Sequence, residues 1–179
     1  MEKEEQGTKA QVTAKERKEG AVNSNVMVGI LYRHGVVLCE QYTGPITGVI
    51  MEKVIYSAFP QAFEKSIDPK GKRFLQDGCP RQNCKKAMDA YRAVGASVFK
   101  IPSRSPDLNP IENFFNCIST ELKKQALEKK IRKETFEQFS VHVKKTMLEY
   151  SATKIDKIIE TMDKIIGMVI TAKGMRIKY

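Results

Sequence analysis

The chain alternates short runs rich in β-branched residues with longer segments whose apolar side chains recur at helical spacing, and this order constrains the fold most. Residues 25–32 and 36–42 read as two strands joined by a turn at 33–35, which is typical of a β-hairpin. Strands interleaved with helices predict an α/β protein with a mixed sheet and a helical C-terminal end. The remaining strands are expected at 72–76 and 96–101, and the helices at 47–63, 80–94, 110–130, 133–150 and 153–171.

Local signals support several of these boundaries. Thr47 and Asn109 are suitable N-cap residues, and Pro110 suits the first position of a helix. Gly95 is a typical residue just past a helix end, whereas Pro60 is a candidate interruption of the first helix. The apolar stripe of the last helix indicates core packing, with a partner helix as the alternative.

The first 24 residues are polar and charged, with few large apolar groups, so they predict a disordered or weakly structured tail. Residues 25–179 are then expected to form one domain. The tail lacks the apolar core of a secretory signal, and no apolar run approaches the roughly 18–20 residues of a membrane span. We therefore expect a protein that is not secreted and has no membrane partner.

Four cysteines are present, at positions 39, 79, 84 and 117. A zinc site needs four converging ligands, and the two histidines, His34 and His142, are far in sequence from the closest cysteine pair, Cys79 and Cys84. Reduced thiols are therefore favoured over a metal site or disulfides.

The distribution of charge is more informative than the net charge of +10. Residues 61–104 hold ten basic and four acidic side chains, a net charge of +6, whereas residues 105–120 hold only Asp107 and Glu112. An acidic island inside a basic surround is typical of a metal-dependent site on a polyanion, because carboxylates hold cations while Lys and Arg hold phosphates. The alternative is a basic surface that serves only solubility.

Two carboxylates are the candidate metal ligands. Asp77 follows a short apolar strand, and Glu112 lies in the first turn of a helix after a proline-rich loop. Such positions can bring two ligands together for Mg²⁺. Taken alone, however, Asp77 could be a turn former before Gly78, and Glu112 could simply complement the helix dipole.

The stretches FLQDGCPRQN and IPSRSPDLNPIENFFNCISTELK resemble the catalytic DDE domain of Tc/mariner-type transposases. The motif SPDLNPIE is the most specific part, and 34 residues separate Asp77 from Glu112, as in the Tc branch of that family. The resemblance extends over about residues 25–179 and includes VMVGI and the terminal VITAKGMRIKY.

This resemblance implies an RNase H-like fold, with Asp77 and Glu112 as the second and third catalytic acids of a two-metal site. It implies Mg²⁺ or Mn²⁺ as cofactor, DNA as partner, no small-molecule substrate, a nuclear location and a possible homo-oligomer. The implied chemistry is attack by water or a 3′-hydroxyl on a phosphodiester during DNA transposition and integration.

The chain also departs from the family pattern. The first catalytic aspartate should lie on a strand upstream of VMVGI, yet no aspartate precedes Asp68. We therefore expect the first, central strand to be missing, together with the N-terminal DNA-recognition region. Gly78 and Gln82 stand where the family usually has Asn and His, and the chain has no Trp.

Three functions remain open. The first is a truncated, transposon-derived DDE domain that binds nucleic acid but has little or no catalysis and binds metal weakly. The second is an active nuclease or strand transferase whose missing acid comes from the tail or a partner. The third is a protein-interaction module that uses the C-terminal helix. The expected nucleic-acid-binding residues are Lys70, Lys72, Arg73, Arg81, Lys85, Lys86, Arg104, Lys123 and Lys124.

Overall fold

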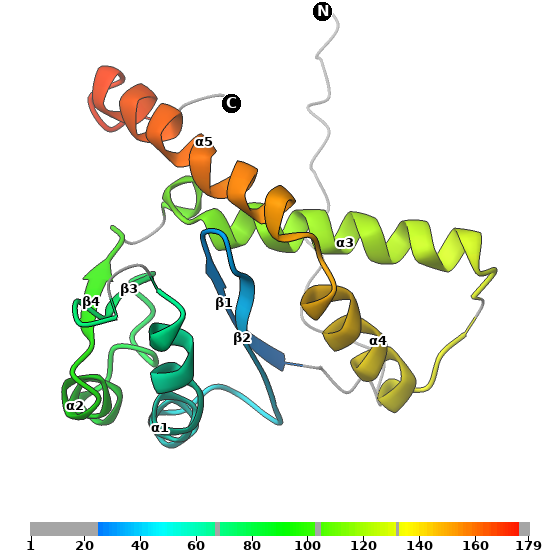
Figure 1. Cartoon of the computed structure of the whole chain (residues 1–179), viewed down its shortest axis with the longest axis horizontal. Helices are drawn as coiled ribbons and strands as arrows, with labels where there is room; N and C mark the ends of the chain where they lie inside the picture. The colour runs from blue at the N-terminus through cyan, green and yellow to red at the C-terminus, as the bar shows by residue number, and fades with distance from the viewer. Residues whose placement is uncertain (1–24, 67–68, 103–104, 132, 176–179) are drawn as a thin grey trace, which may run out of the picture.

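The computed structural model describes residues 25–66, 69–102, 105–131 and 133–175. The tail predicted at 1–24 lies outside these residues. The elements follow the order expected from the sequence (Figure 1). They are β1 (Asn25–Leu31), β2 (Gly35–Tyr42), α1 (Gly48–Glu64), β3 (Arg73–Gln76), α2 (Lys85–Ala93), β4 (Ser97–Lys100), the short 3-10 helix η2 (Pro106–Leu108), α3 (Pro110–Glu128), α4 (Phe136–Leu148) and α5 (Ala152–Thr171).

The strands form two separate two-stranded sheets within the described residues. β1 pairs antiparallel with β2 as the expected hairpin, and β3 pairs in parallel with β4. The predicted mixture of parallel and antiparallel pairing is therefore present, but no described hydrogen bond joins β1 to β3. Figure 1 shows the two strand pairs side by side in the same layer.

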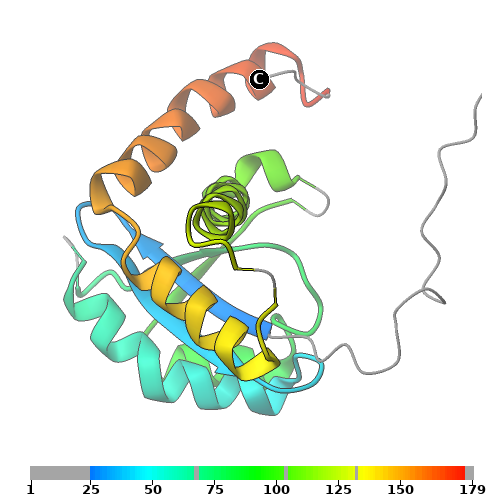
Figure 2. The ribbon, with the colours of Figure 1, turned by 90° about the vertical axis from the view of Figure 1, so that its right-hand side faces the viewer.

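Helices cover both faces of the hairpin, because its side chains alternate between two cores. Met27 and Leu38 pack with α1 and α2, whereas Val28 and Cys39 pack with α3, α4 and α5. Figure 2 shows α1 below the hairpin and α3 above it. The result is a three-layer arrangement in which the C-terminal end of β3 and the N-terminal end of α3 line the same cavity.

Most predicted helix signals are confirmed. The Thr47 hydroxyl accepts a hydrogen bond from the Ile50 amide at 3.3 Å, and the Asn109 side chain accepts one from Ile111 at 3.3 Å. The helix α1 continues through Pro60 to Glu64, so the candidate interruption does not end it.

The predicted start of the second helix at Pro80 is wrong, because α2 begins at Lys85. The Asn83 side chain instead donates to the carbonyls of Asp77 and Cys79, at 3.0 and 2.8 Å. These bonds stabilise a turn that competes with helix formation.

The last helix is only partly a core element. Ile155 and Ile165 are buried, but Ile166 and Ile170 are 44% and 70% exposed. Figure 1 shows the C-terminal half of α5 projecting beyond the other helices. None of the helices in the described ranges has the length and apolar character needed to cross a bilayer.

Candidate metal and nucleic-acid site

Asp77 lies immediately after β3, in a turn that is stabilised by hydrogen bonds to the backbone carbonyl and the side chain of Asp77. Its Oδ1 accepts a hydrogen bond from the Cys79 amide at 3.1 Å, and its carbonyl accepts the bond from Asn83. The turn-forming role considered from the sequence is therefore real, but it engages one carboxylate oxygen and leaves the side chain exposed. The carboxylate remains able to bind a cation.

A buried polar network supports this turn from below. The Tyr91 hydroxyl donates to Gln76 Oε1 at 3.0 Å, and Gln76 Nε2 donates to Asn83 Oδ1 at 3.1 Å. Burial raises the pKa of Tyr91 above its ordinary value of 10, so the hydroxyl remains a donor at neutral pH. The network connects α2 through β3 to the backbone of Asp77.

Sequence reasoning missed this network, although one signal pointed to it. Gln76 shares a strand face with Phe74, which packs into the core beside Tyr91. A polar side chain at a core position needs a hydrogen-bond partner when it is buried, and that requirement could have identified Tyr91 and Asn83.

Glu112 approaches from the other side of the cavity. The Asn109 cap and Pro110 start α3 and place Glu112 in its first turn, where its side chain is exposed. A negative charge is favourable there because it complements the helix dipole. Glu112 and Asp77 nevertheless line the same cavity of about 460 Å³, although they come from different elements.

The donor set of this cavity suits a hard divalent cation. Two carboxylates can supply oxygen ligands to Mg²⁺ or Mn²⁺, with water and phosphate oxygens completing the coordination shell. Within the described residues, however, no cluster of three or more His, Cys, Asp or Glu side chains is arranged for a metal. Among the described residues that line this cavity, Asp77 and Glu112 are the two acidic ones.

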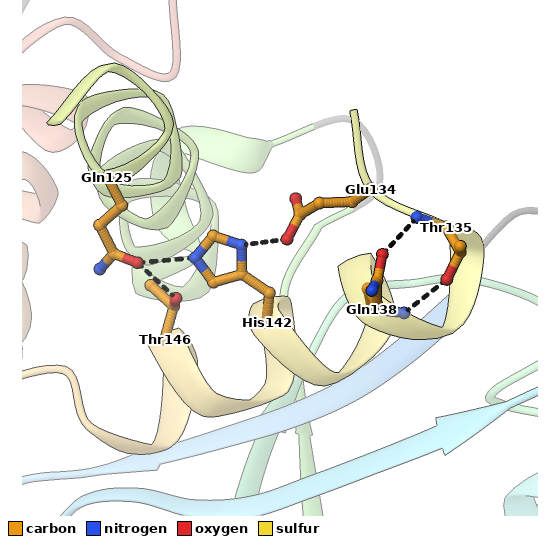
Figure 3. A network of polar contacts seen from close by, with 6 residues as sticks. All are labelled: Gln125, Glu134, Thr135, Gln138, His142 and Thr146. Carbon is orange, nitrogen blue, oxygen red and sulfur yellow. Dashed lines mark hydrogen bonds and ion pairs between the residues drawn. The ribbon is translucent and has the colours of Figure 1, made fainter. Parts of the chain in front are cut away.

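The histidines and cysteines do not add to this set. His142 is used between α3 and α4, where its ring nitrogens face Glu134 and Gln125 at 3.0 and 2.8 Å (Figure 3). All four cysteines are free, as expected, and burial raises the pKa of the Cys39 thiol. His142 therefore joins α3 to the start of α4, and Cys39 packs in the core beside Phe114.

One of the predicted basic residues lines the cavity, and three others follow Asp77 along the chain. Arg73 lines the cavity, and Arg81 lies exposed in the turn that follows Asp77. Lys85 and Lys86 are exposed in the first turn of α2. None of the four is ion-paired with another described residue.

The other predicted basic residues do not line the cavity, or lie outside the described residues. The Lys72 ammonium donates to the Val94 carbonyl at 2.8 Å, which ties the start of β3 to the end of α2. Lys124 lies 3.8 Å from Glu128, and with Lys123 it is three turns beyond Glu112 on α3, about 17 Å along the helix axis. Lys70 is exposed, and Arg104 lies outside the described residues.

Comparison with known sequences identifies related proteins. A family model described as DDE superfamily endonuclease matches residues 3–135. The transposases of the transposable elements Tcb1 and Tcb2 from Caenorhabditis briggsae are each 27% identical over 106 residues. The match covers 59% of this chain and 37% of each transposase, so the chain spans well under half the length of these relatives.

Solved structures show the same fold. The catalytic domain of Mos1 mariner transposase matches with a TM-score of 0.69 and 14% identity, over 81% of this chain and 72% of that domain. The Mos1 paired-end complex with Mn matches with a TM-score of 0.72 and 15% identity, over 99% of this chain and 51% of that one. These likenesses confirm the RNase H-like fold, and the family match covers most of the sequence. The chain therefore belongs to the DDE superfamily endonucleases.

Proposed function

We propose that this chain is a transposon-derived DDE domain that binds DNA and has little or no catalytic activity. Asp77 and Glu112 would be two ligands of its metal centre. The observation that carries this proposal is their position: two acids from separate elements line one cavity together with Arg73, which has no ion-pair partner among the described residues.

DNA binding would use the basic turn and the start of α2. Arg81, Lys85 and Lys86 are exposed and close together in sequence, so they can contact successive phosphates. The first turn of α2 contains no acidic residue, and its Cys84 cap makes no side-chain hydrogen bond to the helix. The helix dipole therefore adds to the positive potential of the lysines.

A bound Mg²⁺ or Mn²⁺ would polarise a phosphodiester and activate the attacking oxygen. In this chain, Asp77 and Glu112 would hold the ion, and Arg73 would help to neutralise a phosphate at the cavity. Two carboxylates position a pair of divalent ions less firmly than three, so we expect weak metal binding. Loss of one positioning ligand commonly costs several kcal/mol of transition-state stabilisation. Each loss of about 1.4 kcal/mol lowers the rate tenfold, so the rate falls by orders of magnitude.

Fluorescence anisotropy with a labelled DNA duplex at low salt tests the binding step. The double variant Arg81→Gln/Lys85→Gln should bind about tenfold more weakly and show a smaller dependence on salt, because fewer counterions are released. The control Lys157→Gln/Lys164→Gln removes the same charge from the exposed surface of α5 and should bind like the parent. Absence of binding by the parent chain, or equal losses in both variants, would contradict the proposal.

A nicking assay on supercoiled DNA with Mn²⁺ tests the catalytic step. We expect no cleavage above the level given by Asp77→Ala and Glu112→Ala. Cleavage that disappears in both variants would instead support an active enzyme completed by a further acid.

A second function has separate support. Ile166 and Ile170 are exposed on the projecting part of α5, so this helix can contact a partner, including another copy of the chain. Light scattering after size exclusion should then report an oligomer that Ile166→Glu/Ile170→Glu converts to a monomer. A strict monomer for the parent chain would count against this candidate.

As a DNA-binding protein, the chain is proposed to act in the nucleus.

A further inference from the structure

The sheet formed by β3 and β4 has one face packed on helices and one open face. On the packed face, Phe74 joins the core of α1 and α2, and Gln76 bonds to Tyr91. Because side chains alternate along a strand, Arg73 and Leu75 lie on the opposite face. Leu75 is 40% exposed there, while α3 and α5 pack on the hairpin of β1 and β2.

An aromatic ring lies on this open face. Phe99 is the partner of Leu75 in the parallel register, so the two side chains share a face. Phe99 is 69% exposed, and its strand, β4, lies on the far side of β3 from β1 (Figure 1). A single exposed apolar side chain is ordinary. Here, however, the ring adjoins a second exposed apolar residue and a basic one, Arg73, and we call these three residues the open β3–β4 face.

The open β3–β4 face is continuous with the candidate metal site. Arg73 and Leu75 line the same cavity as Asp77 and Glu112. Strands rise about 3.3 Å per residue and lie about 4.8 Å apart, so the Cα atom of Phe99 is about 8 Å from that of Asp77. That distance corresponds to about two steps of a stacked DNA strand, at ~3.4 Å each.

The chemistry of the open β3–β4 face favours a nucleotide as its occupant. A nucleobase stacks on an aromatic ring, while a neighbouring cation binds the phosphate of the same strand. Arg73 makes no ion pair with another described residue and can supply this charge. The apolar part of the face is only two side chains wide, which is far less than the ~800 Å² per partner of a stable protein interface.

We propose that the open β3–β4 face is a subsite for an unpaired nucleobase of DNA, which stacks on Phe99 beside Leu75 while Arg73 contacts the adjacent phosphate. This inference rests on the proposed DNA binding and adds a preference to it. A base inside a duplex must first be unstacked at a cost, whereas an unpaired base is already available. The chain therefore binds DNA with a single-stranded tail more tightly than blunt duplex, and it accepts any base because every base has a π-face.

The test compares two labelled DNAs by fluorescence anisotropy with the whole chain at low salt. One is a blunt duplex, and the other is the same duplex with a single-stranded tail of about four nucleotides. The parent should bind the tailed DNA about tenfold more tightly. Phe99→Ala should lose this preference, whereas Phe99→Trp should keep it because the indole also stacks.

Two further variants separate stacking from a change of fold. Phe99→Leu keeps an apolar side chain on β4 but removes the ring, so it should lose the preference even if Phe99→Ala is poorly folded. Phe139→Ala is the matched control, because Phe139 is a partly exposed phenylalanine on α4, and this variant should keep the preference. A tail that contains 5-iodouracil should also photo-crosslink to Phe99 in the parent and not in Phe99→Leu.

The outcomes distinguish this inference from the proposed DNA binding. If the parent binds both DNAs equally and Arg81→Gln/Lys85→Gln weakens both, DNA binding stands and the subsite is overturned. If the parent binds neither DNA, the proposed DNA binding fails and the subsite fails with it. An unchanged preference in Phe99→Ala would overturn the subsite, because the tail would then lie elsewhere. Conversion of a dimer to a monomer by Phe99→Ala, with the same preference for tailed DNA, would instead show that a second copy covers this face.

Discussion

The α3–α4 junction and the cavity between β1 and β3, which we call the β1–β3 slot, both contain polar groups, but among the described residues those of the junction have more partners. At the junction, His142 lies between Glu134 and Gln125, and Gln125 also accepts from Thr146 at 3.3 Å (Figure 3). At the slot, two strand edges and two carboxylates have few described partners. We therefore expect the first region to contribute mainly to stability and the second mainly to binding.

This difference in hydrogen bonding predicts that substitutions in the two regions will affect stability differently. The side chains of His142 and Glu134 are only 14% and 22% exposed, so removal of one partner leaves polar atoms that water reaches poorly. Slot-facing groups meet open space, so their loss changes little in the free protein. Stability should therefore follow the junction, and binding should follow the slot.

His142→Ala should have the largest effect on stability. It leaves both Gln125 Oε1 and Glu134 without the ring contact, which should lower the free energy of unfolding by about 2 kcal/mol. The matched control is the other histidine, because His34 is exposed in the β1–β2 turn and His34→Ala should cost less than about 0.5 kcal/mol. Urea unfolding of both variants measures the difference, and equal losses would break the comparison.

Tyr91→Phe should have an intermediate effect, because Tyr91 lies between the core and the slot. It removes the hydroxyl that donates to buried Gln76 and should cost about 1 kcal/mol at neutral pH. Gln76→Leu should be less harmful in the Tyr91→Phe background than alone, because the two groups share one bond. Additive losses in the double variant would show that this hydrogen bond contributes little.

The same tyrosine gives a pH prediction. Burial raises its pKa in the folded state above the ordinary value of 10 that applies in the unfolded chain. Its contribution to stability is therefore fully present below pH 10 and is lost as pH rises from 10 toward the folded pKa. Tyr91→Phe should show a shallower alkaline loss of stability than the parent, and parallel curves would contradict the cause.

Leu75→Pro should affect stability less than His142→Ala or Tyr91→Phe. Its N–H faces the slot and Leu75 is 40% exposed, so this variant should differ from Leu75→Ala by less than about 1 kcal/mol. Thermal unfolding of the two variants provides the measurement. A larger loss would mean that the Leu75 amide already has a partner in the free protein.

Much of this fold follows from the sequence because its signals are local. The β-branched, apolar run at residues 25–31, the Asn109 cap and the apolar stripe of α3 each specify an element without knowledge of its neighbours. The start of α2 could not be placed, because Asn83 bonds to carbonyls that only the folded turn brings near. The division of the strands into two sheets was not predicted, because strand periodicity does not reveal which strand edges pair.

The candidate site likewise combines residues predicted from the sequence with contacts that only the folded chain reveals. Sequence position and the family motif predicted Asp77 and Glu112 as site residues, but not the Tyr91–Gln76–Asn83 network beneath Asp77. Lys72 was expected to face nucleic acid, but its backbone φ is +39° and its ammonium binds the Val94 carbonyl, so it joins two elements. Charge along the sequence does not distinguish a lysine that is free from one that is engaged.

Hydrogen exchange of the free protein, followed amide by amide along β3, tests most directly the claim that the sheet is open between β1 and β3. Phe74 and Gln76 direct their amides to β4 and should exchange at least about 100-fold more slowly than Arg73 and Leu75, which direct theirs to the slot. Protection that alternates along the strand is the predicted result. Equal protection at all four amides would show that the slot edge is already paired, and would contradict the account.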